Sequence, residues 1–174
     1  MKPSDEWQTP KALFKELDEL YGPFFLDACC TRVNCLVDKH KDYLQGGWGV
    51  DYLSQIVHDD IQSRRLNWYE DNDSIFMNPP YSNPEPFIKK AWEDAKYFRV
   101  VILVPVSILS NKYMDFLDGM KILRKYEGIS DSRIRDWLRG IEIVHLSRRV
   151  KFEHPTKKVS SPPFACCLII MDRR

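Results

Sequence analysis

The sequence predicts an α/β fold with a mostly parallel sheet, a C-terminal antiparallel strand pair and helices on both faces. Short apolar strand patterns alternate with amphipathic helical patterns along the chain, which is typical of a parallel sheet. Two strand patterns then end the chain without a helix between them, which indicates an antiparallel pair. A length of 174 residues suits one domain. We therefore expect a single domain over residues 1–174, with room for a helical insertion around 119–140.

The first two elements follow from capping and burial patterns. Thr9 can cap a helix and Pro10 fits a first turn, so a helix is predicted to begin there. The same helix is predicted to end at Gly22-Pro23. The apolar run over 24–30 that follows is a buried-strand pattern.

The remaining elements are predicted from the same kinds of pattern. Strands are expected at 74–77, 99–106, 141–146 and 165–171, and helices at 84–98, 113–123 and 133–138, with a looser helical pattern at 52–61. Ligands of such sheets bind at the carboxyl ends of the strands. Asp27 and Asn78 both lie at such ends, which predicts where the site is.

The cysteines indicate a reducing environment. The chain has five of them, an odd number, as the adjacent pairs Cys29-Cys30 and Cys166-Cys167 and the single Cys35. No C-x-x-C spacing occurs, so we expect buried structural thiols and no metal.

The N-terminus has no apolar signal segment and no apolar run approaches the roughly 20 residues that span a bilayer. A cytoplasmic protein without a membrane partner, monomeric or weakly dimeric, is the expectation.

The net charge of +1 conceals an asymmetry between the two parts of the chain. Residues 1–99 carry 12 basic and 17 acidic side chains, whereas residues 100–174 carry 14 basic and 8 acidic ones. If a nucleic acid binds, the basic second part is predicted to meet its phosphates.

The stretch Asn78-Pro79-Pro80-Tyr81-Ser82 carries the clearest chemical signal. Two successive prolines stiffen the backbone, so the Asn78 side-chain oxygen and the Pro79 carbonyl can converge on one amino group. A conjugated amine such as adenine N6 is a poor nucleophile until both of its hydrogens are accepted, after which it can attack an electrophilic methyl group. Tyr81 offers a face on which a base can stack. The plainer alternative is a rigid turn after a strand, with Asn78 as a local cap.

Five motifs occur in a distinctive order along the chain. They are DEWQTP at 5–10, FLDAC at 25–29, NPPYS at 78–82, Pro105 after an apolar run, and RVKF at 149–152. This order resembles that of the phage-type DNA N6-adenine methyltransferases. The resemblance covers nearly the whole chain and implies a Rossmann-like methyltransferase fold, S-adenosylmethionine as the cofactor, an adenine-containing DNA site as the partner, and the cytoplasm of a bacterium or phage-infected host as the location.

The resemblance also implies roles for individual residues. It assigns catalysis to Asn78, Pro79, Pro80 and Tyr81. It assigns cofactor binding to Trp7, Thr9, Pro10, Asp27, Ala28, Cys29 and Asn78, and it assigns substrate binding to Tyr81, Ser82, Phe152, Arg149 and Lys151. Asp27 is expected to hold the cofactor amino group. The acid near its ribose or adenine is chosen from Asp38, Asp42, Asp51, Asp59 and Asp60, and we favour Asp51 and Asp60.

Several alternatives stay open at this point. The same chemistry suits another conjugated amino or amide group, such as protein glutamine, RNA adenine or cytosine N4. A catalytically silent DNA-binding module with this fold is a third hypothesis, against which the intact W-x-T-P and NPPY motifs argue. Arg149 and Lys151 are equally compatible with a solvated, charged hairpin, and residues around 119–140 with a helical decoration that does not contact DNA.

Overall fold

The structure is a computed structural model that describes residues 7–30, 34–37, 74–110, 140–154 and 164–174. Several predictions fall outside these residues: the helices at 52–61, 113–123 and 133–138, and the insertion around 119–140 except Gly140. Within the described part of the chain, no helix is long and apolar enough to cross a membrane.

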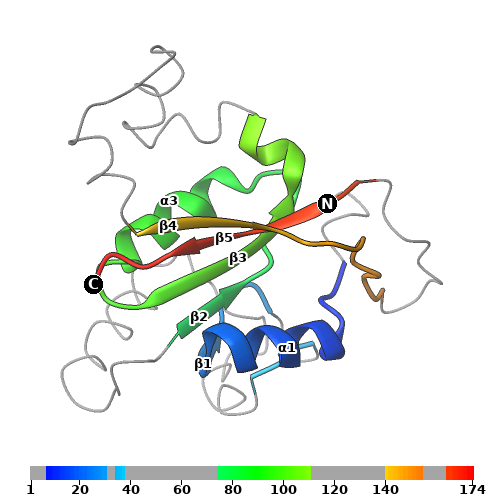
Figure 1. Cartoon of the computed structure of the whole chain (residues 1–174), viewed down its shortest axis with the longest axis horizontal. Helices are drawn as coiled ribbons and strands as arrows, with labels where there is room; N and C mark the ends of the chain where they lie inside the picture. Colours follow the sequence, from blue (N-terminus) through cyan, green and yellow to red (C-terminus); the bar gives the residue numbers. More distant parts are fainter. Residues whose placement is uncertain (1–6, 31–33, 38–73, 111–139, 155–163) are drawn as a thin grey trace.

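Five strands form one mixed sheet in the order β1-β2-β3-β5-β4 (Figure 1). The first three strands are parallel: β1 (Phe24–Asp27), β2 (Ser74–Met77) and β3 (Arg99–Pro105). β5 (Cys166–Met171) runs antiparallel to both of its neighbours, β3 and the edge strand β4 (Ile141–His145). The predicted α/β class, with a parallel part and a C-terminal antiparallel pair, is confirmed.

Composition explains why the last strand of the chain lies inside the sheet and β4 lies at its edge. Every residue of β5 is apolar and buried, as a strand covered on both faces requires. β4 places the polar Glu142 and His145 among its apolar residues, and both are exposed. The chain therefore closes its sheet by inserting its final strand between two earlier ones.

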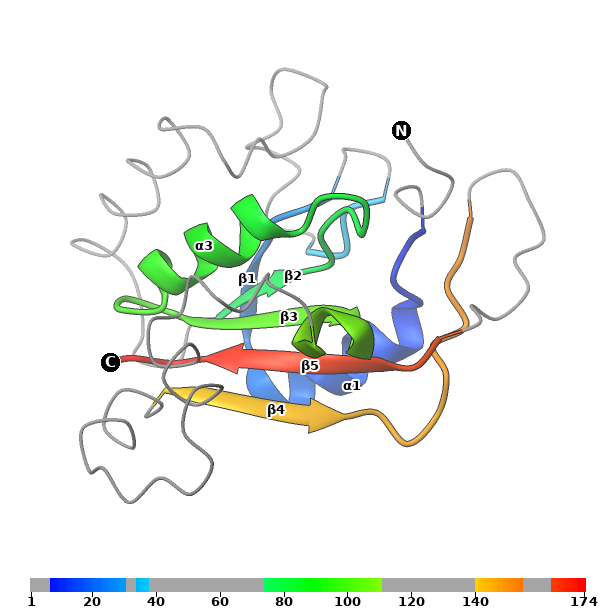
Figure 2. The same cartoon turned by 90° about the horizontal axis from the view of Figure 1, so that it is seen from above.

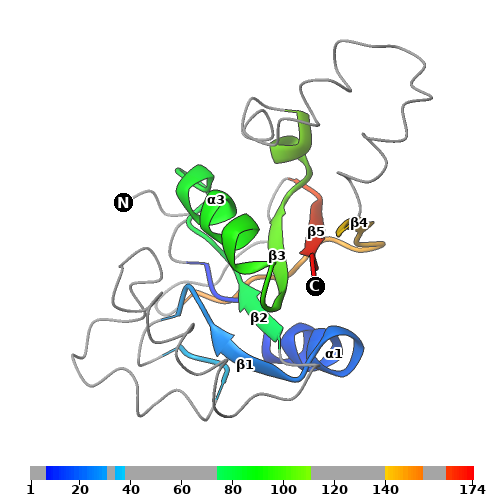
Figure 3. The same ribbon diagram turned by 90° about the vertical axis from the view of Figure 1, so that its left-hand side faces the viewer.

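The two described α-helices cover opposite faces of the sheet (Figures 2 and 3). α1 (Lys11–Tyr21) buries Leu17 against one face, and α3 (Glu85–Asp94) buries Ile88 and Ala91 against the other. Alternating strand residues supply the two cores because successive side chains point to opposite faces. The α1 side holds Phe24, Phe76, Val101, Leu103, Leu168 and Ile170, and the α3 side holds Ile75, Met77, Val100, Ile102, Val104 and Ile169.

The connection from α1 to β1 is fixed by one side chain. The Asp18 carboxylate accepts a hydrogen bond from the Phe24 N–H at 2.6 Å, and the Asp18 carbonyl accepts one from the Gly22 N–H at 2.9 Å. A Cβ at Gly22 would collide with Asp18, so a glycine is required there. The predicted end of the helix at Gly22 is confirmed.

Several element boundaries differ from their predictions. β1 ends at Asp27, three residues before the predicted end of its pattern, and β3, β4 and β5 each differ by one residue at one end. Thr9 does not cap α1: Pro10 occupies the cap position without a side-chain cap bond, and Thr9 is buried just before it. α3 ends at Asp94, four residues earlier than predicted, because the Tyr97 and Phe98 N–H groups both donate to the Asp94 carbonyl. That turn buries Phe98 and delivers the chain to β3.

Candidate active site

The carboxyl ends of β1 and β2 bring Asp27 and Asn78 to the same edge of the sheet. Asp27 is paired with Phe76, and the Ala28 N–H donates to the Phe76 carbonyl at 2.9 Å, just before the chain reaches Asn78. The thiol of Cys29 lies within hydrogen-bonding reach of the Asn78 backbone. The motifs around residues 27 and 78, predicted separately from the sequence, therefore form one neighbourhood.

The N-terminal segment joins this neighbourhood by pairing with the segment before β5. Gln8 and Glu153 form an isolated antiparallel bridge, with N–H to carbonyl distances of 2.8 and 2.9 Å. Beside it, the rings of Trp7 and Phe152 stack at 5.5 Å with an interplanar angle of 17°. Two predicted site segments at opposite ends of the chain thus lie side by side.

The carboxamide of Asn78 is oriented by Trp7. Its Nδ2 donates to the Trp7 carbonyl at 3.2 Å, and since only the nitrogen end can donate, the oxygen end faces the other way as an acceptor. The Asn83 N–H donates to the Pro80 carbonyl at 3.1 Å, which closes the turn. Among the described residues, no donor occupies the Pro79 carbonyl. Two acceptors, the Asn78 side-chain oxygen and the Pro79 carbonyl, therefore follow β2 directly, and no hydrogen bond among the described residues occupies them.

An aromatic cluster lies next to these acceptors. It consists of Trp7, Tyr81, Phe152 and Phe164. Tyr81 meets the other three rings edge to face, with centroids 5.9 to 6.5 Å apart. Phe152 is only 3% exposed, and its ring packs against the rings of Trp7 and Tyr81. Its predicted role in holding a base stays a prediction.

The Tyr81 hydroxyl is buried within this cluster. It lies beside the Cys166 thiol, a weak partner, and makes no conventional hydrogen bond to the described residues. Burial, with the neighbouring Cys166, raises the pKa of Tyr81 well above its ordinary value of 10.0. The phenol therefore stays neutral, and Tyr81 is suited to stacking and unsuited to proton transfer at neutral pH.

Asp27 is a buried acid with few partners. Its carboxylate accepts a hydrogen bond from the Leu36 N–H at 3.4 Å, and it is only 5% exposed. Burial raises its pKa from 3.8 to about 7, while hydrogen bonds from the backbone of Leu36 and Cys29 act in the opposite direction. No Lys or Arg among the described residues forms an ion pair with it. A cationic ligand would supply the compensation that the described residues do not.

The other predicted cofactor residues differ in how they meet this site. Thr9 and Ala28 are buried, at 6% and 0% exposed, and their contact with a cofactor stays a prediction. Cys29 is half-buried, and burial together with Asp27 raises the pKa of its thiol well above 9.0. The predicted Asp51 and Asp60 lie outside the described residues.

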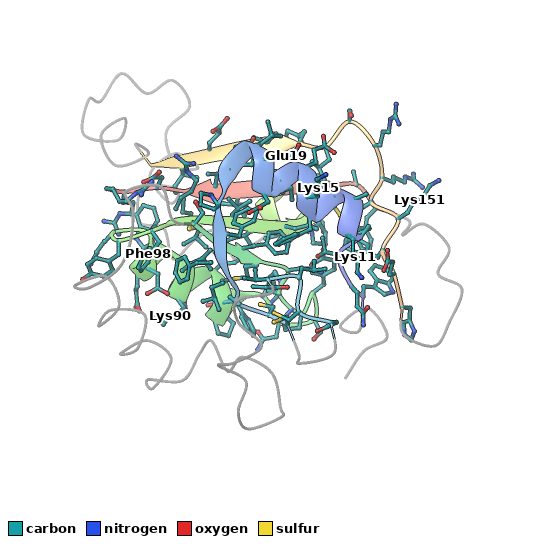
Figure 4. All side chains as sticks on the ribbon, turned by 90° about the horizontal axis from the view of Figure 1, so that it is seen from below. Lys11, Lys15, Glu19, Lys90, Phe98 and Lys151 are labelled. Carbon is teal, nitrogen blue, oxygen red and sulfur yellow. The ribbon has the colours of Figure 1, made fainter. Side chains whose placement is uncertain are left out.

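A groove with basic residues along one wall runs between α1 and the segment before β5. It has a volume of about 540 Å³, and the basic residues Arg148, Arg149 and Lys151 line it opposite Glu16 of α1. These three basic side chains are exposed. Figure 4 shows Lys151 on the segment that passes the end of α1 carrying Lys11. Ser82, also predicted to bind substrate, is exposed in the loop after Tyr81.

Three features of this site were missed in the sequence. The bond between Asn78 and Trp7 joins residues 71 positions apart, and no local pattern signals it. Phe164, the fourth aromatic residue, stands alone in a polar connection. Cys30 and Cys35 both lie close to Asp27. Their C-x4-C spacing was the available signal for that cluster.

Comparison with known proteins supports the class that this arrangement suggests. The family model described as DNA N-6-adenine-methyltransferase (Dam) matches residues 1–174, and the chain belongs to this family. A DNA N-6-adenine-methyltransferase of Escherichia phage T1 is 30% identical over 93 residues, which is 53% of this chain and 32% of that protein. The match thus spans about a third of the relative's length. No solved structure matches the chain.

Proposed function

We propose that this protein transfers a methyl group from S-adenosylmethionine to the N6 amino group of adenine in DNA, on a Rossmann-like methyltransferase fold. The observation that carries the proposal is the Asn78 carboxamide, whose Nδ2 donates to the Trp7 carbonyl so that its oxygen faces the other way as an acceptor. The next residue, Pro79, has a carbonyl to which none of the described residues donates. The parallel β1-β2-β3 sheet with helices on both faces, and the family of the chain, support the same conclusion.

The two acceptors account for the activation of the amine. Asn78 Oδ1 and the Pro79 carbonyl each accept a hydrogen bond from one of the two N6 hydrogens. The nitrogen lone pair is then less delocalised into the ring and can attack the methyl group. The cofactor, when bound, supplies an electrophilic methyl group on a sulfonium. Transfer of that methyl group to N6 would leave the electron pair of the C–S bond on the cofactor's sulfur. The surplus N6 proton leaves through the Asn78 and Pro79 oxygens to solvent.

The cofactor fits the buried acid at the end of β1. Asp27 has no cationic partner among the described residues, and the ammonium group of the cofactor's methionine portion would provide one. The Trp7–Pro10 segment, which precedes α1, lies close enough to Asn78 to share in the same binding. We assign the cofactor to the space between these two segments.

DNA is assigned to the aromatic and basic side of the site. Tyr81 would stack against an adenine that has left the duplex, since a paired base cannot present its amino group to Asn78. Arg149 and Lys151 are exposed along the groove and would contact phosphates. This assignment places the positively charged residues near the base-binding loop rather than on a separate recognition domain.

The Asn78→Ala variant tests the central step. Methyl transfer from tritiated cofactor to DNA should fall by at least about 100-fold, as when one group that stabilises a transition state is removed. Cofactor affinity, measured by calorimetry, should stay within about threefold. Asn83→Ala is the matched control, because Asn83 is exposed in the same loop and contributes its backbone N–H to the turn. Transfer by Asn78→Ala at the wild-type rate would refute the acceptor role.

The alternative substrates are separated by the same assay. Wild-type protein is incubated with labelled cofactor and DNA, RNA or total protein, and the methylated base or residue is identified by mass spectrometry. Label on N6-methyladenine of DNA is expected. Label confined to protein glutamine, RNA or cytosine N4 would replace the proposed substrate, and no label on any of them would favour the silent DNA-binding module.

A further inference from the structure

Three metal-ligating side chains meet beside the end of β1. A carboxylate oxygen of Asp27 and the sulfur atoms of Cys30 and Cys35 all lie within 4.8 Å of one another. Asp27 and Cys30 are buried and Cys35 is half-buried. This group, which we call the Asp-Cys-Cys cluster, has no part in the methyl-transfer step proposed above except through Asp27.

Backbone contacts hold the cluster together. The Leu36 N–H donates to Asp27 Oδ2 at 3.4 Å, which ties the segment of residues 34–37 to the end of β1. Cys30 and Cys35 are within hydrogen-bonding distance of each other through their side chains. The Cys35 thiol also donates to the Val37 carbonyl at 3.7 Å. Contacts within the protein therefore hold the three ligand atoms near one another.

The separations suit a small thiophilic cation. Ligands around tetrahedral Zn²⁺, with Zn–S of about 2.3 Å and Zn–O of about 2.0 Å, lie about 3.5 to 3.8 Å apart. The three ligand atoms, all within 4.8 Å of one another, are close to that spacing. Two sulfur ligands and one carboxylate select Zn²⁺ over the hard cations Mg²⁺ and Ca²⁺. The C-x4-C interval between Cys30 and Cys35 falls within the usual spacing of zinc ligands.

We propose that the Asp-Cys-Cys cluster binds one Zn²⁺ ion, with the fourth position left to solvent. Each thiol releases its proton to solvent as its S–Zn bond forms, and the metal keeps its +2 charge throughout. One consequence rests on the proposed function: Asp27 cannot hold the metal and the cofactor's ammonium group at the same time. Zinc and S-adenosylmethionine should therefore compete.

Cobalt substitution in the chelator-treated full chain tests the metal site directly. One Co²⁺ per chain should bind and produce the near-ultraviolet absorption band of thiolate-to-cobalt charge transfer, and Zn²⁺ should displace it. Cys30→Ser and Cys35→Ser should each weaken binding by about 10-fold or more and reduce the band. Cys29→Ser is the matched control, because Cys29 is the immediate neighbour of Cys30 and is not one of the three ligands.

The outcomes separate this proposal from the proposed function. Circular dichroism shows whether each serine variant is folded, and Asp27→Glu, which keeps a carboxylate, gives a second test of the cluster in a different residue. The absence of a charge-transfer band in folded wild-type protein, or equal affinity in the Cys29, Cys30 and Cys35 variants, would overturn the metal site. Ready loss of the Cys30 and Cys35 thiols to a disulfide, with no metal bound, would overturn it also. Asn78→Ala should bind cobalt normally whether or not it transfers methyl groups.

Discussion

The two ends of the sheet differ in whether their polar groups are paired with charged partners. At the amino ends of β2 and β3, Asp172 binds both Arg99 and Arg174, at 3.2 and 2.8 Å. The Tyr21 carbonyl there accepts bonds from Ser74 Oγ and Arg99. We call this group the paired end (Figure 1).

At the carboxyl ends the described residues leave polar groups without strong partners. Within the described part of the chain, Asp27 forms no ion pair, the Pro79 carbonyl meets no donor and the Tyr81 hydroxyl has the Cys166 thiol as its neighbour. A buried polar group without a partner costs free energy, whereas a paired one stabilises the fold. The paired end therefore serves stability, whereas the polar groups at the carboxyl ends of β1 and β2 keep their capacity to bind ligands. Substitutions at the two ends should therefore have different readouts.

The largest expected effect at the site end is on cofactor affinity. Asp27→Asn keeps the shape of the side chain and removes the charge that we assign to the cofactor's ammonium group. Affinity for S-adenosylmethionine, measured by calorimetry on metal-free protein, should fall by about 100-fold, the order expected for one buried charge-assisted contact. The free energy of unfolding should not fall. Unchanged affinity would remove Asp27 from the cofactor site and place it among structural groups.

A smaller effect is expected from the basic groove. Reversing charge in the double variant Arg149→Glu, Lys151→Glu should weaken DNA binding and lower the slope of log affinity against log salt by about 2, since each phosphate that is no longer neutralised changes the slope by about one unit. Thermal stability should be unchanged, because both side chains are exposed. Lys15→Glu on α1 is the control, since Lys15 is exposed and not among the groove-lining residues. An unaltered salt slope would indicate that Arg149 and Lys151 belong to a solvated hairpin and do not contact phosphates.

At the paired end the effect should be on stability and should depend on pH. Hydrogen bonding to Arg174, then the charges of Arg174 and Arg99, lower the pKa of Asp172 below 3.8 in the folded state. Its contribution to stability is therefore present above pH 3.8 and is lost as the pH falls through the lowered value. Asp172→Asn should cost about 0.5 to 1 kcal/mol of unfolding free energy at pH 7, since the pair is partly exposed.

Denaturant unfolding of wild type and variant across pH 2 to 7 measures this difference. The two curves should converge at the acidic end. Methyl transfer by Asp172→Asn at pH 7 should match wild type. A variant that lost activity and kept its stability would contradict the separation between the two ends.

Sequence patterns predicted the scaffold better than they predicted the contacts within the site. β2 has the predicted bounds, and Gly22 ends α1 as predicted, because burial periodicity and turn residues are local properties. The insertion of β5 between β3 and β4 and the bond from Asn78 to Trp7 depend on segments that are far apart in the chain. The residue types of Thr9 and Pro10 predicted a Thr9 cap, whereas the pairing of Gln8 with Glu153 holds that segment in the fold. The positions of the motifs predicted which residues lie together at the site. The orientation of each side chain there depends on tertiary contacts, which the motifs do not show.

The smallest expected effect concerns the hydroxyl of Tyr81. Tyr81→Phe keeps the stacking face and removes a buried oxygen that, among the described residues, has the Cys166 thiol as a weak partner. Stability should therefore stay unchanged or rise by up to about 1 kcal/mol. Methyl transfer should stay within about twofold, since the hydroxyl keeps its proton at neutral pH and takes no part in proton transfer. Tyr81→Leu should reduce transfer strongly by removing the aromatic face. If Tyr81→Phe instead lost activity as strongly as Tyr81→Leu, the hydroxyl would have to contact the substrate, and the site end would hold one more ligand-binding group than stacking requires.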